Sequence, residues 1–120
     1  STSRRQRQMC IRDSIDIVMC NNDEIASGVS KVVVELGKKD VIIVGFDGIQ
    51  AGVQNVIDGK VTCTVAQLPF EMGYSAVKNA VATAKGETVE KEIETDVTLV
   101  TQENAESYME ILKTNLEKYK

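Results

Sequence analysis

The 120-residue chain has no histidine, no tryptophan and a single proline, Pro69. The lack of histidine excludes histidine-dependent catalytic triads and most zinc sites. No apolar stretch approaches the roughly 20 residues that a membrane-spanning helix requires. The chain also lacks the Gly-x-Gly-x-x-Gly and P-loop patterns that accompany nucleotide binding. We therefore expect no enzymatic activity, no metal site and no cofactor.

Cysteine is scarce, and its spacing is not typical of a metal or redox site. Cys20 and Cys63 fall inside apolar runs, where a free cysteine behaves as a small apolar residue. If the strands lie in chain order, one strand separates these two cysteines, which puts them roughly 9–10 Å apart. A disulfide needs Cα atoms within about 7 Å. We predict free thiols.

Residues 1–14 show no helix or strand periodicity, and they contain four arginines and one aspartate. Read back into codons, residues 4–14 resemble a translated transposase-tagmentation sequencing adapter. We exclude residues 1–14 from fold reasoning and expect the genuine chain to begin near Ile15, as the C-terminal part of a longer protein. The alternative is a basic arm that binds nucleic acid or a membrane. Without the net +3 of this segment the remainder carries −7 instead of −4, which argues against binding to a phosphate backbone.

Three apolar runs, 15–20, 41–46 and 61–66, alternate with stretches of helical periodicity. Short strands that alternate with helices are typical of βαβ units and a parallel sheet. We therefore predict an α/β fold in which these three strands are adjacent, in chain order.

The helices between the runs have recognisable ends. Asn22 or Asp23 is a natural N-cap for the first helix, and Asp47-Gly48 is expected to open the second. Pro69 suits the first turn of the third helix, because its missing N–H costs nothing there. A fourth, half-exposed strand is expected over 95–100, followed by a helix from about residue 102 to the C-terminus.

Each apolar run is followed within two residues by a candidate polar side chain: Asn22, Asp47 or Gln67. In parallel sheets ligands bind outside the carboxyl ends of the strands, so these side chains are expected on one edge. Amide and carboxylate groups suit a small polyol better than a metal or a phosphate. Simpler interpretations exist: Asn22 and Asp47 could each be only an N-cap, Gln67 an ordinary loop residue, and Phe46 a core residue.

Three segments carry a resemblance to a known family: 21–26 (Asn-Asn-Asp-Glu-Ile-Ala), 44–48 (Val-Gly-Phe-Asp-Gly) and 65–69 (Val-Ala-Gln-Leu-Pro). Together they resemble the C-terminal half of periplasmic sugar-binding proteins of the ribose-binding type, the substrate receptors of ABC importers. The resemblance covers about residues 15–101.

The resemblance implies a partial type I periplasmic-binding-protein fold, with a three-layer parallel sheet and flanking helices. In that fold two α/β lobes joined by a hinge hold a sugar between them. By resemblance, 15–67 supplies βα units of the C-terminal lobe and 68–94 the hinge and a helix of the N-terminal lobe. Residues 95–120 supply a return strand and the C-terminal helix.

The resemblance also assigns roles to the polar side chains. Asn22, Asp47 and Gln67 match sugar-contacting positions, and Phe46 more loosely matches an apolar contact. The implied ligand is a monosaccharide, such as a ribose-like pentose, held without a cofactor. The implied partners are ABC permease subunits and a chemoreceptor, with no nucleic acid, and the implied location is the periplasm or, through a lipid anchor, the cell exterior.

Two other classes compete with this interpretation. The effector domain of a lactose-repressor-type regulator shares the fold but tends to have Gly-Phe-Asp-Asp where this chain has Gly45-Phe46-Asp47-Gly48. An α/β enzyme could use Asp23 and Asp47 as a phospho-acceptor site, but no lysine accompanies them at a strand end.

Overall fold

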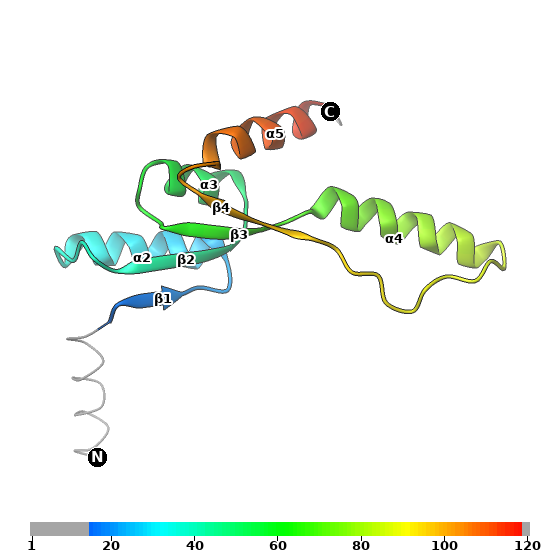
Figure 1. The fold of residues 1–120 in the computed structure, drawn as a ribbon, viewed down its shortest axis with the longest axis horizontal. Coiled ribbons are helices and arrows are strands. Elements are labelled where there is room, and N and C mark those ends of the chain that lie inside the picture. The colour runs from blue at the N-terminus through cyan, green and yellow to red at the C-terminus, as the bar shows by residue number, and fades with distance from the viewer. Residues whose placement is uncertain (1–14, 119–120) are drawn as a thin grey trace, which may run out of the picture.

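The computed structural model describes residues 15–118, so the adapter prediction for residues 1–14 lies outside the described residues. Strands and helices alternate along the chain, and the four strands form one sheet in the order β1-β2-β3-β4 (Figure 1). The elements are β1 (Ile17–Met19), α2 (Asp23–Glu35), β2 (Ile42–Asp47), α3 (Gln50–Ile57), β3 (Cys63–Gln67), α4 (Pro69–Ala84), β4 (Val97–Thr101) and α5 (Ala105–Lys118).

The strand pairing confirms the predicted α/β sheet. β1 pairs with β2 and β2 with β3, both in parallel, whereas β4 runs antiparallel to β3 and makes the sheet mixed. Cys20 directly follows β1 and Cys63 begins β3, so β2 lies between them, and both thiols are free as predicted.

The two faces of the sheet differ sharply, because successive side chains of a strand point to opposite sides. One face packs against α2 and α3 and is buried at Ile43, Gly45, Thr64, Ala66 and Val100. The other face is apolar and exposed at Ile17, Met19, Ile42, Val97 and Leu99; Met19 is 80% exposed. Residues 15–118 therefore contain the sheet and the helical layer on one of its faces.

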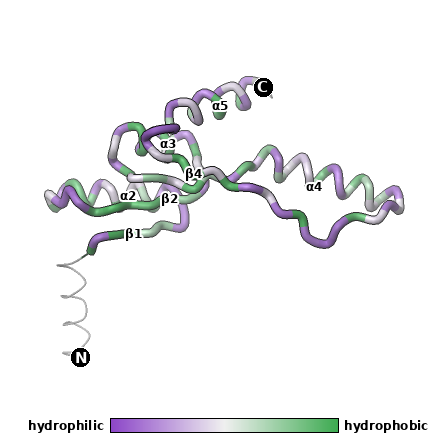
Figure 2. The backbone as a smooth tube through the Cα atoms, viewed as in Figure 1, coloured by the Kyte–Doolittle hydropathy of each residue, from purple (hydrophilic) through white to green (hydrophobic). Residues whose placement is uncertain are grey.

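Helix α4 projects away from the sheet and buries none of its residues (Figure 1). The helix begins at Pro69, as predicted. Hydrophobic and hydrophilic residues are interspersed along the projecting arm (Figure 2), and Tyr74 and Val77 are 73% and 67% exposed. Neither α4 nor any other described helix is long and apolar enough to cross a membrane.

Helix α5 closes the core from the side of α3, through Ala105, Tyr108 and Met109. We predicted a start near residue 102, but the helix begins at Ala105, because Asn104 forms a turn first. The Asn104 Oδ1 accepts a hydrogen bond from the backbone N–H of Thr101 at 2.8 Å, and its amide nitrogen donates to the carbonyl of Leu99 at 3.0 Å.

Tyr108 gives this packing a pH signature. Burial, with the nearby negative charge of Asp23, raises the pKa of the Tyr108 phenol above its ordinary value of 10.0. A raised pKa stabilises the fold below about pH 10, and that contribution is lost as the pH rises further. Between about pH 8 and pH 11, the free energy of unfolding should fall more steeply for the unsubstituted chain than for Tyr108→Phe. Urea unfolding at several pH values measures how the free energy of unfolding changes with pH in each protein. The raised thiol pKa values of Cys20 and Cys63 contribute equally to both proteins, so they do not affect the comparison. Equal slopes would contradict the packing.

Candidate functional site

The three polar residues predicted for the site lie at the carboxyl ends of three successive parallel strands. Asn22 lies between β1 and α2, Asp47 is the last residue of β2, and Gln67 is the last residue of β3. Because β1, β2 and β3 are neighbours in the sheet, all three residues belong to one edge, which we call the ligand edge.

Asp47 and Gln67 are in direct contact. The Gln67 Nε2 donates a hydrogen bond of 2.7 Å to the Asp47 Oδ1. Together with Ile49, Pro69 and Met72 they line an open cavity of about 360 Å³. The bond leaves the second carboxylate oxygen of Asp47 and the carbonyl oxygen of Gln67 available as acceptors, with one N–H of Gln67 available as a donor.

The backbone at Asp47 adopts a conformation that side-chain-bearing residues rarely use. Its φ is +109°, and it is the only residue other than glycine with positive φ among residues 15–118. Gly48 follows with φ +73°. The N-cap of α3 is Ile49, so the interpretation of Asp47 as an N-cap is wrong. Such strained positions concentrate at functional sites, because the surrounding structure must hold them in place.

Asn22 does serve as the N-cap of α2. Its Oδ1 accepts a hydrogen bond of 2.7 Å from the backbone N–H of Ile25. This bond fixes the side chain while leaving the two amide N–H groups of Asn22 to donate elsewhere. Capping and ligand binding are therefore compatible at this residue, and Asn22 enters the ligand edge as a donor.

Phe46 lies one residue before Asp47 on β2 and is half-buried. Side-chain alternation puts Phe46 on the face of the sheet that α2 and α3 leave uncovered, beside Val65 of β3. Phe46 does not line the cavity that Asp47 and Gln67 share, and its role as an apolar contact stays a prediction.

Asp23 is a residue of this region whose structural role we did not predict. Asp23 is 2% exposed. One carboxylate oxygen, Oδ2, accepts hydrogen bonds of 2.9 Å from the backbone N–H groups of Gly48 and Ile49. The other, Oδ1, accepts a bond of 2.6 Å from the Thr64 hydroxyl. Asp23 thereby joins the start of α2 to the loop before α3 and to β3.

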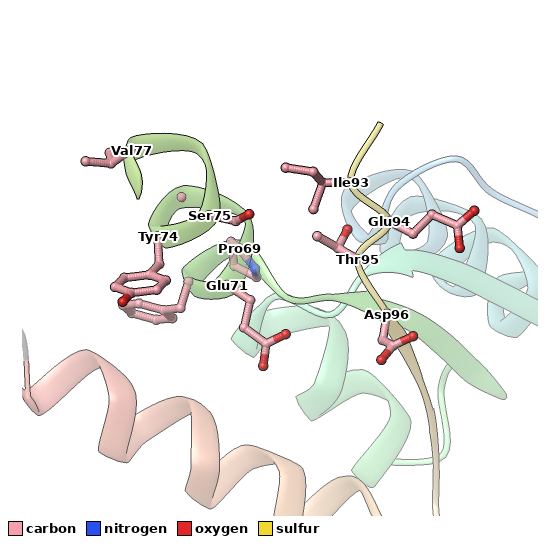
Figure 3. Close-up of a pocket in the computed structure, with 11 residues that line it drawn as sticks. Pro69, Glu71, Tyr74, Ser75, Val77, Ile93, Glu94, Thr95 and Asp96 are labelled. Carbon is pink, nitrogen blue, oxygen red and sulfur yellow. The ribbon is translucent and has the colours of Figure 1, made fainter. Parts of the chain in front are cut away.

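A larger cavity, of about 860 Å³, lies between α4 and the segment 93–96 (Figure 3) and shares Pro69 with the cavity beside Asp47 and Gln67. Figure 3 shows Tyr74 and Val77 on the helix side and Ile93 on the opposite side. The lining of this larger cavity is mostly apolar and includes no residue predicted to bind the ligand. Among residues 15–118, no group of three or more His, Cys, Asp or Glu side chains could hold a metal ion.

Residues 2–88 match the model of a family described as "Periplasmic binding protein domain". The match begins inside the segment that we assign to an adapter, and that assignment stays a prediction. The ribose import binding protein of Escherichia coli K12 is 37% identical over 98 residues, which are 82% of this chain and 33% of that protein. The D-allose-binding periplasmic protein of the same strain is 39% identical over 66 residues, which are 54% of this chain and 21% of that protein.

Solved structures of similar fold include sugar- and inositol-bound proteins. An ABC transporter solute binding protein from Bacillus halodurans C-125 with bound myo-inositol has a TM-score of 0.75 at 37% identity, and the similarity covers 87% of this chain and 36% of that one. A Mycobacterium smegmatis protein in complex with β-D-fucofuranose has a TM-score of 0.75 at 28% identity, covering 88% of this chain and 35% of that one. The chain spans about a third of the length of the curated relatives it matches first, 33% for the E. coli protein. The family model matches well over half of the chain, and the chain belongs to the periplasmic binding protein domain family.

Proposed function

We propose that this chain is part of the substrate-binding component of an ABC-type sugar importer, and that its ligand edge contacts a neutral monosaccharide. The observation that carries the proposal is the contact between Asp47 and Gln67 at adjacent strand ends, on a strained backbone. Relatives named for ribose import and for allose binding support the ligand class. The partners we propose are permease subunits and a chemoreceptor, and the location is the periplasm, or the cell exterior through a lipid anchor.

The hydrogen-bonding groups of the ligand edge suit sugar hydroxyls, which both donate and accept. Asn22 is left with donors, Asp47 with acceptors, and Gln67 with one of each kind. A carboxylate can accept from two neighbouring hydroxyls through charge-assisted bonds, which are the stronger type. An epimer that leaves a buried amide unpaired loses about 1–3 kcal/mol, which provides discrimination between sugars.

The remaining surfaces of the chain support a larger, two-lobed protein. The sheet exposes an apolar face, α4 buries none of its residues, and a mostly apolar cavity lies open beside α4. We propose that residues 68–94 form the hinge and a helix of the other lobe, and that this helix is α4. The rest of the other lobe would pack on α4 and contribute its own sugar contacts. Closure of that lobe would remove water from the ligand edge.

The alternative of a lactose-repressor-type regulator is not favoured. Gly48 occupies the position where that family tends to have aspartate, and a side chain there would collide with Ala66. We further propose a binding role with no catalysis, in keeping with relatives named as binding proteins.

Thermal unfolding of the longer protein that we propose contains this chain tests the function. A ligand that binds only the folded state stabilises it, by about 2.7 kcal/mol when the ligand concentration is a hundred times Kd. This stabilisation raises the melting temperature. Pentoses, hexoses and inositols should be compared with a disaccharide and a sugar phosphate. We expect at least one neutral monosaccharide or inositol to raise the melting temperature by several degrees. A response confined to the sugar phosphate, or no response at all, would contradict the proposal.

A further inference from the structure

We propose that Asp23 is a positioning residue for the ligand edge, an inference that rests on the proposed function. Asp23 is the first residue of α2, it accepts hydrogen bonds from the two residues before α3, and it reaches Thr64 in β3. One buried carboxylate thus connects all three βα units that supply Asn22, Asp47 and Gln67.

The carboxylate acts first as a cap for a helix other than its own. The N-cap of α3, Ile49, has no side chain that can accept a hydrogen bond, and the first turn of α3 contains no acidic residue. Helix N-termini carry unpaired N–H groups and a partial positive charge, which an anion stabilises. Asp23 supplies that anion from α2 and binds the amides of Gly48 and Ile49.

The same bonds control the conformation of Asp47. A peptide unit is planar, so fixing the N–H of Gly48 also fixes the orientation of the Asp47 carbonyl group. That restraint holds Asp47 in its strained backbone conformation, φ +109°, from which its carboxylate meets Gln67. Asn22 directly precedes Asp23, so the bond to Gly48 also keeps the Asn22 cap beside the Asp47 turn.

Two glycines make room for this carboxylate. A Cβ at Gly45, inside β2, would collide with the Asp23 Oδ1, and a Cβ at Gly52, inside α3, would collide with its Cγ and Oδ2. Glycine weakens both strand and helix interiors, so neither position is explained by local propensity. Among residues 15–118 the only ion pair joins Lys60 and Asp58, so the charge of Asp23 is balanced by hydrogen-bond donors and not by a cation.

NMR of the isotope-labelled 120-residue chain tests the proposal with two shape-conserving variants. Asp23→Asn keeps an acceptor oxygen but loses the charge that strengthens its hydrogen bonds. Exchange protection of the Gly48 and Ile49 amides should fall about tenfold relative to the unsubstituted chain. The three-bond HN–Hα coupling of Asp47, which reports φ, should shift toward the value of an averaged backbone. Asp58→Asn, the control, makes the same change in a partly exposed side chain at the other end of α3 and should leave both readouts unchanged.

The proposal is wrong if Asp23→Asn leaves the Asp47 coupling unchanged, or if Asp58→Asn disturbs it equally, since the effect would then come from the loss of any negative charge. In the longer protein, Asp23→Asn should weaken sugar binding about tenfold, and an unchanged affinity would also overturn the proposal. If the unsubstituted longer protein binds no sugar, the proposed function fails, whereas the NMR comparison on this chain still decides whether Asp23 positions Asp47.

Discussion

Asp47→Ala should weaken sugar binding by the longer protein at least tenfold, with little effect on its melting temperature. The carboxylate is the only charged group that we place on the ligand edge, and charge-assisted hydrogen bonds contribute about 1.5–3 kcal/mol each. A loss of 1.4 kcal/mol already corresponds to a factor of about ten in Kd. Isothermal titration calorimetry of both proteins with the same sugar measures the ratio.

The matched control for this prediction is Asp58→Ala. Asp58 ends α3 and pairs with Lys60 at 2.9 Å, in a partly exposed position away from the ligand edge. Both substitutions remove one negative charge, so a long-range electrostatic effect would appear in both. Equal weakening by the two variants, or none by Asp47→Ala, would show that Asp47 does not contact the sugar.

Gly48→Ala should lower the free energy of unfolding of this chain by about 3 kcal/mol. Gly48 has φ +73°, and a Cβ there would lie 2.7 Å from the Cα of Ala66 and closer still to its Cβ. The left-handed backbone costs a side-chain-bearing residue about 1–2 kcal/mol, and overpacking adds about 1–3 kcal/mol. Because backbone lies opposite, no side-chain rotation relieves the collision. Urea unfolding measures the change.

Gly28→Ala is the control for the stability prediction. Gly28 lies within α2, and a Cβ there would meet nothing within 4 Å. Alanine is favoured over glycine in a helix by about 1 kcal/mol, so this variant should be more stable than the parent chain. The two glycine substitutions should therefore move the urea midpoint in opposite directions, and movement in the same direction would contradict the geometry at Gly48.

The order of the sheet was predictable because it depends on local signals. Three short apolar runs separated by amphipathic helices allow few arrangements, and right-handed βαβ connections favour adjacent strands in chain order. Placing Asn22, Asp47 and Gln67 on one edge needed only the rule that parallel strands end together. The antiparallel pairing of β4 was not predicted, since a half-exposed alternating strand is compatible with either direction.

The parts that were missed depend on contacts between distant residues. Asp23 looks like an ordinary first-turn acid of α2, yet its partners Gly48 and Thr64 lie 25 and 41 residues away. One signal could have revealed it: Gly45 and Gly52 weaken a strand and a helix, which suggests a close approach by another group. The opening of α3 at Asp47 was predicted wrongly because a helix cap and a left-handed turn both favour aspartate.

The central claim is that a sugar is held between this ligand edge and a second lobe, and calorimetry of this chain beside the longer protein tests it most directly. About five hydrogen bonds from Asn22, Asp47 and Gln67, each contributing roughly 0.5–1.5 kcal/mol, total about 5 kcal/mol. The cost of association is of similar size, whereas micromolar affinity needs about −8 kcal/mol. We expect this chain alone to bind sugars more weakly than micromolar. The longer protein should bind a pentose, hexose or inositol with micromolar or tighter affinity. Tight binding by this chain alone, or none by the longer protein to any such sugar, would contradict the claim.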